Sequence, residues 1–269
     1  MKCADLHIHS IYSDGMLTPH QIIDIAYENK VNIISITDHD TIDGYKEILG
    51  YETKGVCVVP GIEFSKYDVE SVHILGYNIN LNSERLKKYS KDKKQHDAFQ
   101  FTRILLGLRK LGVRVDIENM KSVYGRINVK NLMSYLVEKG LSKDVDSAYK
   151  ICYSMYPEIE KKLWSIISTR SCIEMIHELG GIAVWAHPLF VSKDYDAMKN
   201  KVILYKTWGL DGIECIHPRH NNFEKELCLR LAYQYNLKVT GGSDYHGGKE
   251  EKSKIGYIES YGKIYGPFL

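Results

Sequence analysis

The 269-residue sequence lacks an apolar run long enough to cross a membrane, and none of its cysteines pair as C-x-x-C. It also lacks internal repeats and low-complexity tracts, which argues against a solenoid or a disordered chain. The N-terminus enters an apolar, strand-like run at once, so no secretory signal is expected. With six scattered cysteines, the pattern predicts a reduced, cytoplasmic protein whose cysteines are small core residues.

Charge is nearly balanced overall but unevenly distributed. Residues 83–170 contain 19 Lys and Arg against 10 Asp and Glu, a net of +9. The rest of the chain contains 17 Lys and Arg against 24 Asp and Glu, a net of −7. An acidic body that could hold cations therefore carries a basic segment that could attract an anion, although many of its lysines are expected to be solvated helix surface.

Short apolar runs alternate with helical patterns along most of the chain. One helix signal is specific: Thr18, Pro19 and Gln21 form an N-cap, a first-turn proline and a capping box. Helices are expected at 43–53, 169–179, 194–208 and 221–235. Strands are expected at 4–8, 32–37, 56–60, 72–79, 181–186, 212–216 and 238–241. Seven strands alternating with helices favour a parallel α/β barrel, a distorted (β/α)₇ TIM-like fold.

The alternation stops in the middle of the chain. Helical patterns are expected at 83–111, 128–139 and 143–154, the first with apolar residues at Phe101, Ile104, Leu105 and Leu108. We interpret 83–168 as a lid-like helical insert, and 1–82 together with 169–269 as the barrel domain.

Histidines and carboxylates stand at or near the ends of almost every expected strand. His7 and His9 alternate, so both point to one face of the first strand, and Asp244 and His246 alternate after the last. Each pattern is weak alone, but their joint occurrence in register with a barrel is hard to produce by chance. The candidate metal ligands are His7, His9, Asp14, His39, Glu63, His73, His187, Asp244 and His246.

This set of nitrogen and oxygen ligands contains no thiolate, which suits Zn²⁺, Mn²⁺ or Fe²⁺. Nine ligands exceed what one ion needs. The simplest arrangement is therefore two or three divalent ions that share a carboxylate. Glu63 is the candidate bridge. Such a centre activates water and stabilises the departing oxygen of a phosphoester.

The motifs resemble those of the PHP (polymerase and histidinol phosphatase) superfamily of metal-dependent phosphoesterases. Four of them read D-L-H-I-H-S (5–10), I-T-D-H-D (36–40), V-W-A-H-P (184–188) and G-S-D-Y-H (242–246). The resemblance covers essentially the whole chain. The S-D-G after the first motif and the helical insert before the third resemble the branch of nucleoside 3′,5′-bisphosphate and AMP phosphatases.

The resemblance implies three metal positions. One would be held by His7, His9, Glu63 and Asp244, a second by Glu63, His73 and His187, and a third by Asp14, His39 and His246. One departure is visible: relatives in this branch commonly read Gly-Arg-Pro-His in the insert, where this chain has Gly125-Arg126-Ile127-Asn128.

The loop after the sixth expected strand, Ile216 to His220, lies at the same rim as the ligands. Arg219 is suited to a bidentate phosphate contact, and His217 and His220 could bind phosphate oxygens or protonate the leaving alkoxide. An ordinary polar loop is the alternative. Arg126 and Ser13 are further candidates for substrate contact.

The sequence therefore predicts a phosphatase that hydrolyses a phosphomonoester of a nucleotide or nucleoside bisphosphate through a metal-activated hydroxide. The expected partner is a small phosphorylated molecule rather than a membrane or a stably bound nucleic acid. Histidinol phosphate or another small phosphate ester is the first alternative. An amidohydrolase or deaminase barrel is the second, and a metal-dependent or vestigial module associated with a polymerase is the third. Metal identity, substrate and oligomeric state are left open.

Overall fold

The computed structural model describes residues 3–65, 72–124, 127–154, 167–247, 253–258 and 262–263. The chain divides into two compact units, Glu84–Ile166 and the remainder on either side of it. These limits lie within two residues of the insert boundaries expected from the sequence.

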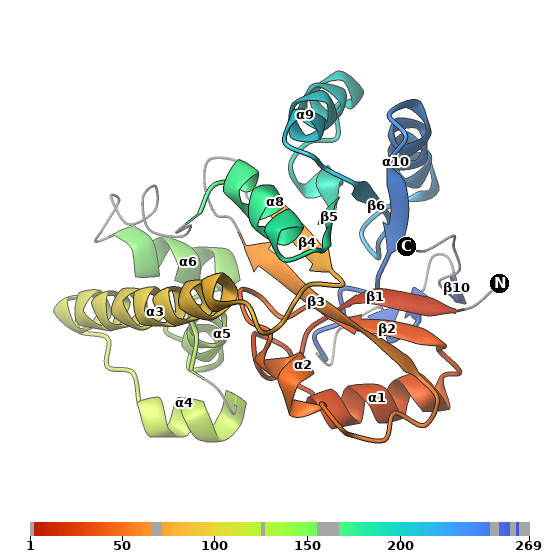
Figure 1. The fold of residues 1–269 in the computed structure, drawn as a ribbon. Helices are drawn as coiled ribbons and strands as arrows, with labels where there is room; N and C mark the ends of the chain where they lie inside the picture. Colours follow the sequence, from red (N-terminus) through yellow and green to blue (C-terminus); the bar gives the residue numbers. More distant parts are fainter. Residues whose placement is uncertain are drawn as a thin grey trace. The chain divides into compact units, whose positions relative to one another are not determined.

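The larger unit is built on a seven-stranded sheet whose spatial order follows the sequence, β1 to β7 (Figure 1). The strands are β1 (Ala4–Ile8), β2 (Ile33–Ile36), β3 (Cys57–Ser65), β4 (His73–Tyr77), β5 (Ile182–Trp185), β6 (Gly212–Ile216) and β7 (Lys238–Gly241). An isolated parallel bridge joins Ile8 to Tyr245, and the backbone N–H of His9 donates to the Tyr245 carbonyl at 3.0 Å. The sheet is thus a nearly closed barrel, which confirms the predicted fold class.

One strand runs against the others. β4 pairs antiparallel with both β3 and β5, whereas the other neighbouring pairs in this sheet are parallel. The expectation of a fully parallel barrel was therefore wrong. Only seven residues separate Ser65 from His73. A parallel crossover needs about a dozen or more residues, so β4 must return antiparallel beside β3.

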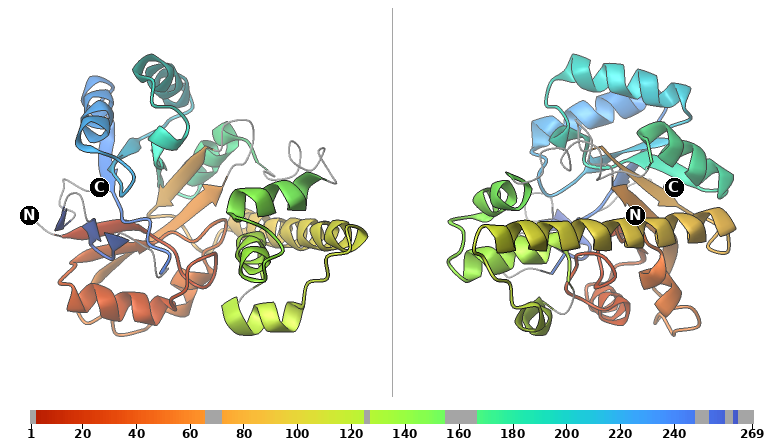
Figure 2. Two further views of the ribbon diagram at one scale, coloured as in Figure 1. Left: turned by 180° about the vertical axis from the view of Figure 1, so that it is seen from behind. Right: turned by 90° about the vertical axis from the view of Figure 1, so that its left-hand side faces the viewer.

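Helices of this unit cover the outside of the sheet in both views of Figure 2. They are α1 (Pro19–Glu28), α2 (Asp43–Glu47), α8 (Thr169–Glu178), α9 (Tyr195–Thr207) and α10 (Asn222–Gln234), with a short 3₁₀ helix, η1 (Pro188–Phe190). The predicted capping box at Thr18 and Gln21 is present. α2 ends at Glu47, six residues earlier than expected. Its N-cap residue, Ile42, has no side chain that can cap the helix, and Gly50 adopts a φ of 82° beyond its end.

Residues of β1 contribute to two apolar clusters of this unit. Outside the sheet, α1 buries Ile22, Ile23 and Ala26 against Ile8 and Ile34. A second cluster is made by strand residues: Leu6, Leu75, Tyr77, Val184 and Ala186. Five of the six cysteines are buried as expected, but Cys57 is exposed.

The C-terminal region adds a small antiparallel sheet that the sequence interpretation missed: β8 (Ser253–Lys254), β9 (Tyr257–Ile258) and β10 (Gly262–Lys263). Its first turn is anchored to the barrel. The Gly256 N–H donates to the Asp5 carboxylate at 2.7 Å, and Ile255 is buried in the cluster around α1.

The regular elements that the structure describes in the smaller unit are all helices: α3 (Glu84–Lys110), α4 (Ile117–Tyr124), α5 (Val129–Glu138) and α6 (Val145–Ser154). Ile104 and Leu108 of α3 lie in its core, with Phe101 and Leu105 packed against them, as their spacing predicted. α4 was not predicted. The signal for it is Asp116, whose carboxylate accepts from the Asn119 N–H at 3.0 Å as an N-cap does.

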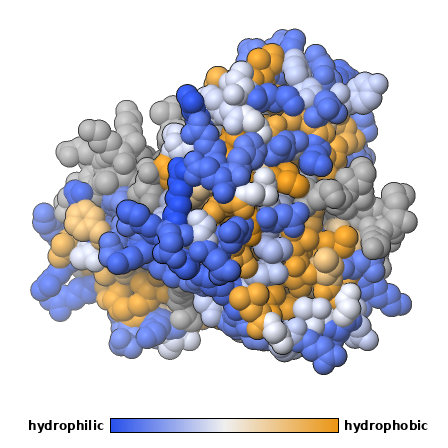
Figure 3. Space-filling view, viewed as in Figure 1, coloured by the Kyte–Doolittle hydropathy of each residue, from blue (hydrophilic) through white to orange (hydrophobic). Residues whose placement is uncertain are grey.

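Within the described residues, every helix is too short or too polar to span a lipid bilayer. Figure 3 shows hydrophobic residues on one face in separate patches between hydrophilic ones. Exposed apolar side chains distributed in this way are normal for a folded domain.

Candidate metal centre

Glu63, near the end of β3, is the centre of the buried cluster. Its carboxylate is fully buried and lies within ion-pair distance of five imidazoles. Oε2 lies 3.3 Å from Nε2 of His7, 3.3 Å from Nε2 of His9 and 3.0 Å from Nδ1 of His39, while Oε1 lies 2.9 Å from Nδ1 of His73 and 3.0 Å from Nε2 of His187. One carboxylate thus joins side chains from both sides of the barrel.

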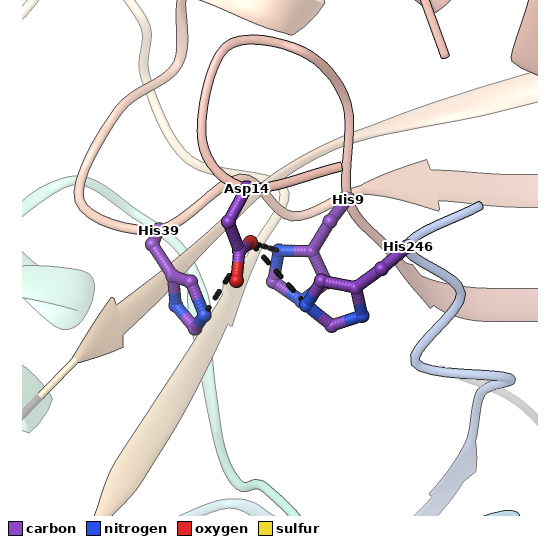
Figure 4. A group of neighbouring side chains, drawn as sticks. All are labelled: His9, Asp14, His39 and His246. Carbon is purple, nitrogen blue, oxygen red and sulfur yellow. Dashed lines mark ion pairs between the residues drawn. The ribbon is translucent and has the colours of Figure 1, made fainter. Parts of the chain in front are cut away.

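A second group surrounds Asp14, in the loop after β1 (Figure 4). Its Oδ1 lies 3.6 Å from Nδ1 of His9, 3.9 Å from Nε2 of His39 and 3.3 Å from Nε2 of His246. The ligand atoms of these four residues can all lie within 4.8 Å of one another. The His9 ring therefore borders both the Asp14 group and the Glu63 group.

Asp244 completes the cluster from the segment after β7. Its Oδ1 lies 3.4 Å from Nε2 of His7 and 3.2 Å from Nε2 of His9. Its backbone has a φ of 48°, and His187 has a φ of 27°, both in the left-handed region that non-glycine residues rarely adopt. Such conformations persist only where the surrounding structure imposes them, and they are concentrated at functional sites.

Close backbone approaches place the first and last motifs together. A Cβ on Gly242 would lie 2.2 Å from the Cβ of His7, and a Cβ on Gly15 would lie 2.2 Å from the carbonyl oxygen of His9. Both positions therefore require glycine. The irregular register between β1 and β2, at Asp5 to Ile8, has the form of a β-bulge. Leu6 joins the strand-residue cluster, whereas the adjacent His7 faces Glu63.

The geometry suits divalent cations. An ion about 2.1 Å from each ligand holds neighbouring ligand atoms roughly 3.0–3.4 Å apart, which is close to most of the spacings around Glu63 and Asp244. Among the described residues, none gives a hydrogen bond of acceptable geometry to Nε2 of His7, Nε2 of His9 or Oε2 of Glu63. A bound cation would provide the missing partner for buried polar atoms that face one another without hydrogen bonds.

The electrostatics agree with that interpretation. Burial raises the pKa of Glu63, but the charges of His39 and His7 outweigh it and hold the pKa well below its ordinary value. Burial lowers the pKa of His9, but Asp244 and Glu63 outweigh it and raise the pKa to about 10. The carboxylates are therefore charged at neutral pH, and they create a potential that attracts positive charge.

The loop that carries Asp14 is supported by Asp38, the middle residue of the second motif. The carboxylate of Asp38 accepts from the Ser10 N–H at 2.7 Å and from the hydroxyls of Ser10 and Ser13 at 2.6 Å. The Ser13 hydroxyl therefore stabilises this loop. Its predicted contact with substrate stays a prediction.

All nine residues expected from the sequence as ligands lie in this cluster. Two buried carboxylates beside them were missed. Asp5 accepts from the backbone N–H groups of Ser243 and Gly256, and Glu214 contacts His7 and His187. The available signal was a charged residue inside the apolar run G-I-E-C-I of β6.

Both histidines of the loop after β6 form hydrogen bonds within the protein. The Arg219 N–H donates to Nδ1 of His217, so the proton of a neutral His217 is on Nε2, where Oδ2 of Asp244 accepts it at 3.2 Å. His220 donates from Nδ1 to the Cys215 carbonyl, and burial lowers its pKa to about 4. In this arrangement His217 orients Asp244, and the predicted roles of His217 and His220 toward the phosphate and the leaving group stay predictions.

Arg219 itself is exposed, with its guanidinium carbon 4.6 Å from the centre of the Phe190 ring. That ring stacks on His187 at a centroid distance of 4.5 Å. The Phe190 ring therefore lies between Arg219 and His187, which belongs to the buried cluster. The other predicted arginine, Arg126, lies outside the described residues.

Comparison with known proteins gives a consistent picture. A sequence profile of the PHP domain matches residues 5–111. A phosphoribosyl 1,2-cyclic phosphate 1,2-diphosphodiesterase of Eggerthella lenta is 34% identical over 94% of this chain and 97% of its own length. A 5′-3′ exoribonuclease of Haemophilus influenzae is 29% identical over 91% and 90% of the two chains.

A 3′,5′-nucleoside bisphosphate phosphatase of Chromobacterium violaceum is 25% identical over 99% of this chain and 95% of its own. Among solved structures, a candidate metal-dependent phosphoesterase from Bifidobacterium adolescentis superposes with a TM-score of 0.79. It covers 96% of this chain and 92% of its own at 24% identity, which supports the fold.

Proposed function

This chain belongs to the PHP family of metal-dependent phosphoesterases, and on that basis we propose that it hydrolyses a phosphomonoester of a nucleotide or nucleoside bisphosphate. The observation that carries the proposal is the Glu63 carboxylate surrounded by five imidazoles. Nitrogen and carboxylate ligands at this density are typical of sites that hold two or more divalent ions.

The candidate ligands divide into three overlapping sets. They are His7, His9, Glu63 and Asp244; Glu63, His73 and His187; and Asp14, His39 and His246, beside which His9 also lies. Zn²⁺, Mn²⁺ or Fe²⁺ bound there would activate water and stabilise charge on the phosphoryl and leaving oxygens. The protein's own contribution is to keep the carboxylates ionised and to orient the ligand side chains. His217, for example, orients the carboxylate of Asp244.

The names of the relatives favour a phosphorylated ribose as the substrate class. One acts on a phosphoribosyl cyclic phosphate, one on a nucleoside bisphosphate and one on RNA. A ribose or nucleoside phosphate is common to all three. A substrate with a second phosphate on the sugar also fits the basic charge of residues 83–170, since that segment could attract the group that is not hydrolysed.

A panel of phosphate esters tests this proposal. Turnover of nucleoside 3′,5′-bisphosphates, 5′-mononucleotides, histidinol phosphate and an aryl phosphate should be compared with Mn²⁺ and with Zn²⁺. The bisphosphate or the mononucleotide should have the highest kcat/KM. Preference for histidinol phosphate would support the first alternative, whereas amide or amine hydrolysis without phosphate release would identify an amidohydrolase or deaminase.

Arg219 should bind phosphate rather than metal. Arg219→Ala should leave metal content unchanged and lower kcat/KM by a factor that corresponds to about 2–4 kcal/mol of lost transition-state stabilisation. The reason is that an arginine contact strengthens as charge develops on the phosphoryl oxygens. Steady-state kinetics and elemental analysis measure the two quantities. Arg230→Ala is the matched control, because Arg230 is also an exposed arginine over an aromatic ring, that of Tyr195. Equal kinetics in both variants would make the loop after β6 a simple turn.

Arg126 should affect substrate choice. Arg126→Ala should raise the KM for a nucleoside bisphosphate at least about tenfold more than the KM for an aryl phosphate, since only the former carries a second anionic group. Added salt should weaken the bisphosphate preferentially, because screening weakens exposed charge contacts. Arg114→Ala, an exposed arginine in the same helical unit, is the control. Equal effects on both substrates would assign selectivity to the barrel loops.

A further inference from the structure

Glu214 contacts two candidate metal ligands through its two oxygens. It lies in β6 and is fully buried. Its Oε1 is 3.0 Å from Nδ1 of His7, and its Oε2 accepts from the backbone N–H of His187 at 2.8 Å. The two ligands come from β1 and from the segment just after β5. One carboxylate therefore holds groups that approach the centre from two sides.

The contact with His7 determines which ring nitrogen faces the centre. An ionised carboxylate only accepts hydrogen bonds, so Nδ1 of His7 carries a proton. Nε2 then points to Glu63 and Asp244, at 3.3 Å and 3.4 Å. A histidine whose outer nitrogen donates to a carboxylate is fixed in orientation and is a more basic metal ligand.

The contact with His187 acts on the backbone. His187 has φ 27° and ψ 59°, a conformation that costs free energy for a residue with a Cβ. The hydrogen bond from its N–H to Glu214 helps to hold that conformation, from which Nε2 of the ring reaches Oε1 of Glu63 at 3.0 Å. Loss of the acceptor would leave this buried N–H without a partner.

We propose that Glu214 is a positioning residue that orients His7 and His187 for divalent cation binding at Glu63. The inference rests on the proposed metal-dependent function. It has a selective consequence, because among the described contacts of Glu214 none involves Asp14, His39 or His246. Loss of Glu214 should weaken the ligand sets that contain His7 or His187, and should spare the Asp14 set.

Glu214→Gln tests the proposal with almost no change of shape. The carboxamide has one acceptor oxygen, and its NH₂ group cannot accept from the His7 ring or from the His187 N–H. Chelator competition with Zn²⁺ should show about 10–100-fold weaker binding at the affected sets. The Asp14→Asn variant lacks the third ligand set. When Glu214→Gln is added to that variant, the same loss of zinc affinity should apply to all the zinc that remains bound.

Glu224→Gln is the matched control. Glu224 is also a buried carboxylate, but it caps α10 and contacts Lys193 rather than a candidate ligand. The control should bind zinc like the wild-type protein even if its melting temperature falls. His7→Gln combined with Glu214→Gln should lose less affinity than the sum of the single losses, since both changes act partly through one ring.

A measurement without a variant covers the case in which Glu214→Gln does not fold. In the zinc-loaded wild-type protein, ¹⁵N NMR should show His7 bound to metal through Nε2 and protonated at Nδ1. Binding through Nδ1 would overturn the inference, as would equal zinc affinity in Glu214→Gln and wild type. Absence of zinc binding by the wild-type protein would instead contradict the proposed function.

Discussion

Glu63→Gln should abolish both metal binding and turnover. A neutral amide presents one acceptor oxygen where the carboxylate presents two charged ones, and both oxygens of Glu63 face imidazoles. We expect the bound metal to fall by at least one ion per chain. We expect kcat to fall by more than the roughly 10²–10³-fold that follows loss of a single catalytic electrostatic group. Elemental analysis and steady-state kinetics measure the two effects.

Glu174→Gln is the comparison for that experiment, because Glu174 pairs only with Arg170 on the exposed face of α8 among the interactions described for it. That variant should keep wild-type metal content and turnover. Near-normal kcat in Glu63→Gln would remove Glu63 from the centre and leave it an ordinary strand-end carboxylate. Lost turnover with full metal content would assign it a role in the reaction but not in holding ions.

Metal removal should have the second large effect. Protein purified without chelator should contain at least two transition-metal ions per chain. EDTA followed by gel filtration should reduce activity to background, and added Mn²⁺ or Zn²⁺ should restore it. The melting temperature should also fall, because each ion at 1,000 times its Kd stabilises the folded state by about 4 kcal/mol.

That result would follow from the chemistry of the cluster. Without ions, like-charged carboxylates and crowded imidazoles share a small buried volume: the rings of His9 and His246 lie 4.2 Å apart, and those of His9 and His39 lie 4.5 Å apart. Fewer than one ion per chain, together with full activity in EDTA, would exclude a metal-dependent reaction and leave the histidines as a structural network.

The sequence predicted the strands and the cluster well because both depend on local patterns. Short apolar runs bounded by loop residues located all seven barrel strands. Ligand-type residues at their ends had to converge once the strands formed a barrel. Thr18 and Gln21 located the start of α1 because capping is a contact between near neighbours.

Features that depend on distant contacts were not predictable in this way. The reversal of β4 was missed because β3 pairs with β4 as far as Ser65, five residues beyond the expected end of that strand, which leaves a connection too short for a crossover. Glu214 resembled an ordinary strand residue until His7 and His187 were placed beside it. The hydrogen bonds of His217 and His220 are set by an N–H and a carbonyl of the loop backbone, which the residue type does not encode.

The bridge between Ile8 and Tyr245 has a consequence for the order in which the protein can mature. Asp244 and His246 are synthesised more than 230 residues after His7 and His9. Bringing the two segments together closes a very long loop, which is among the slowest contacts for a chain to form. A growing chain therefore holds an incomplete ligand set until the segment that contains Asp244 and His246 has been made. Metal capture by the full cluster must wait until the segment that contains Asp244 and His246 has joined His7 and His9.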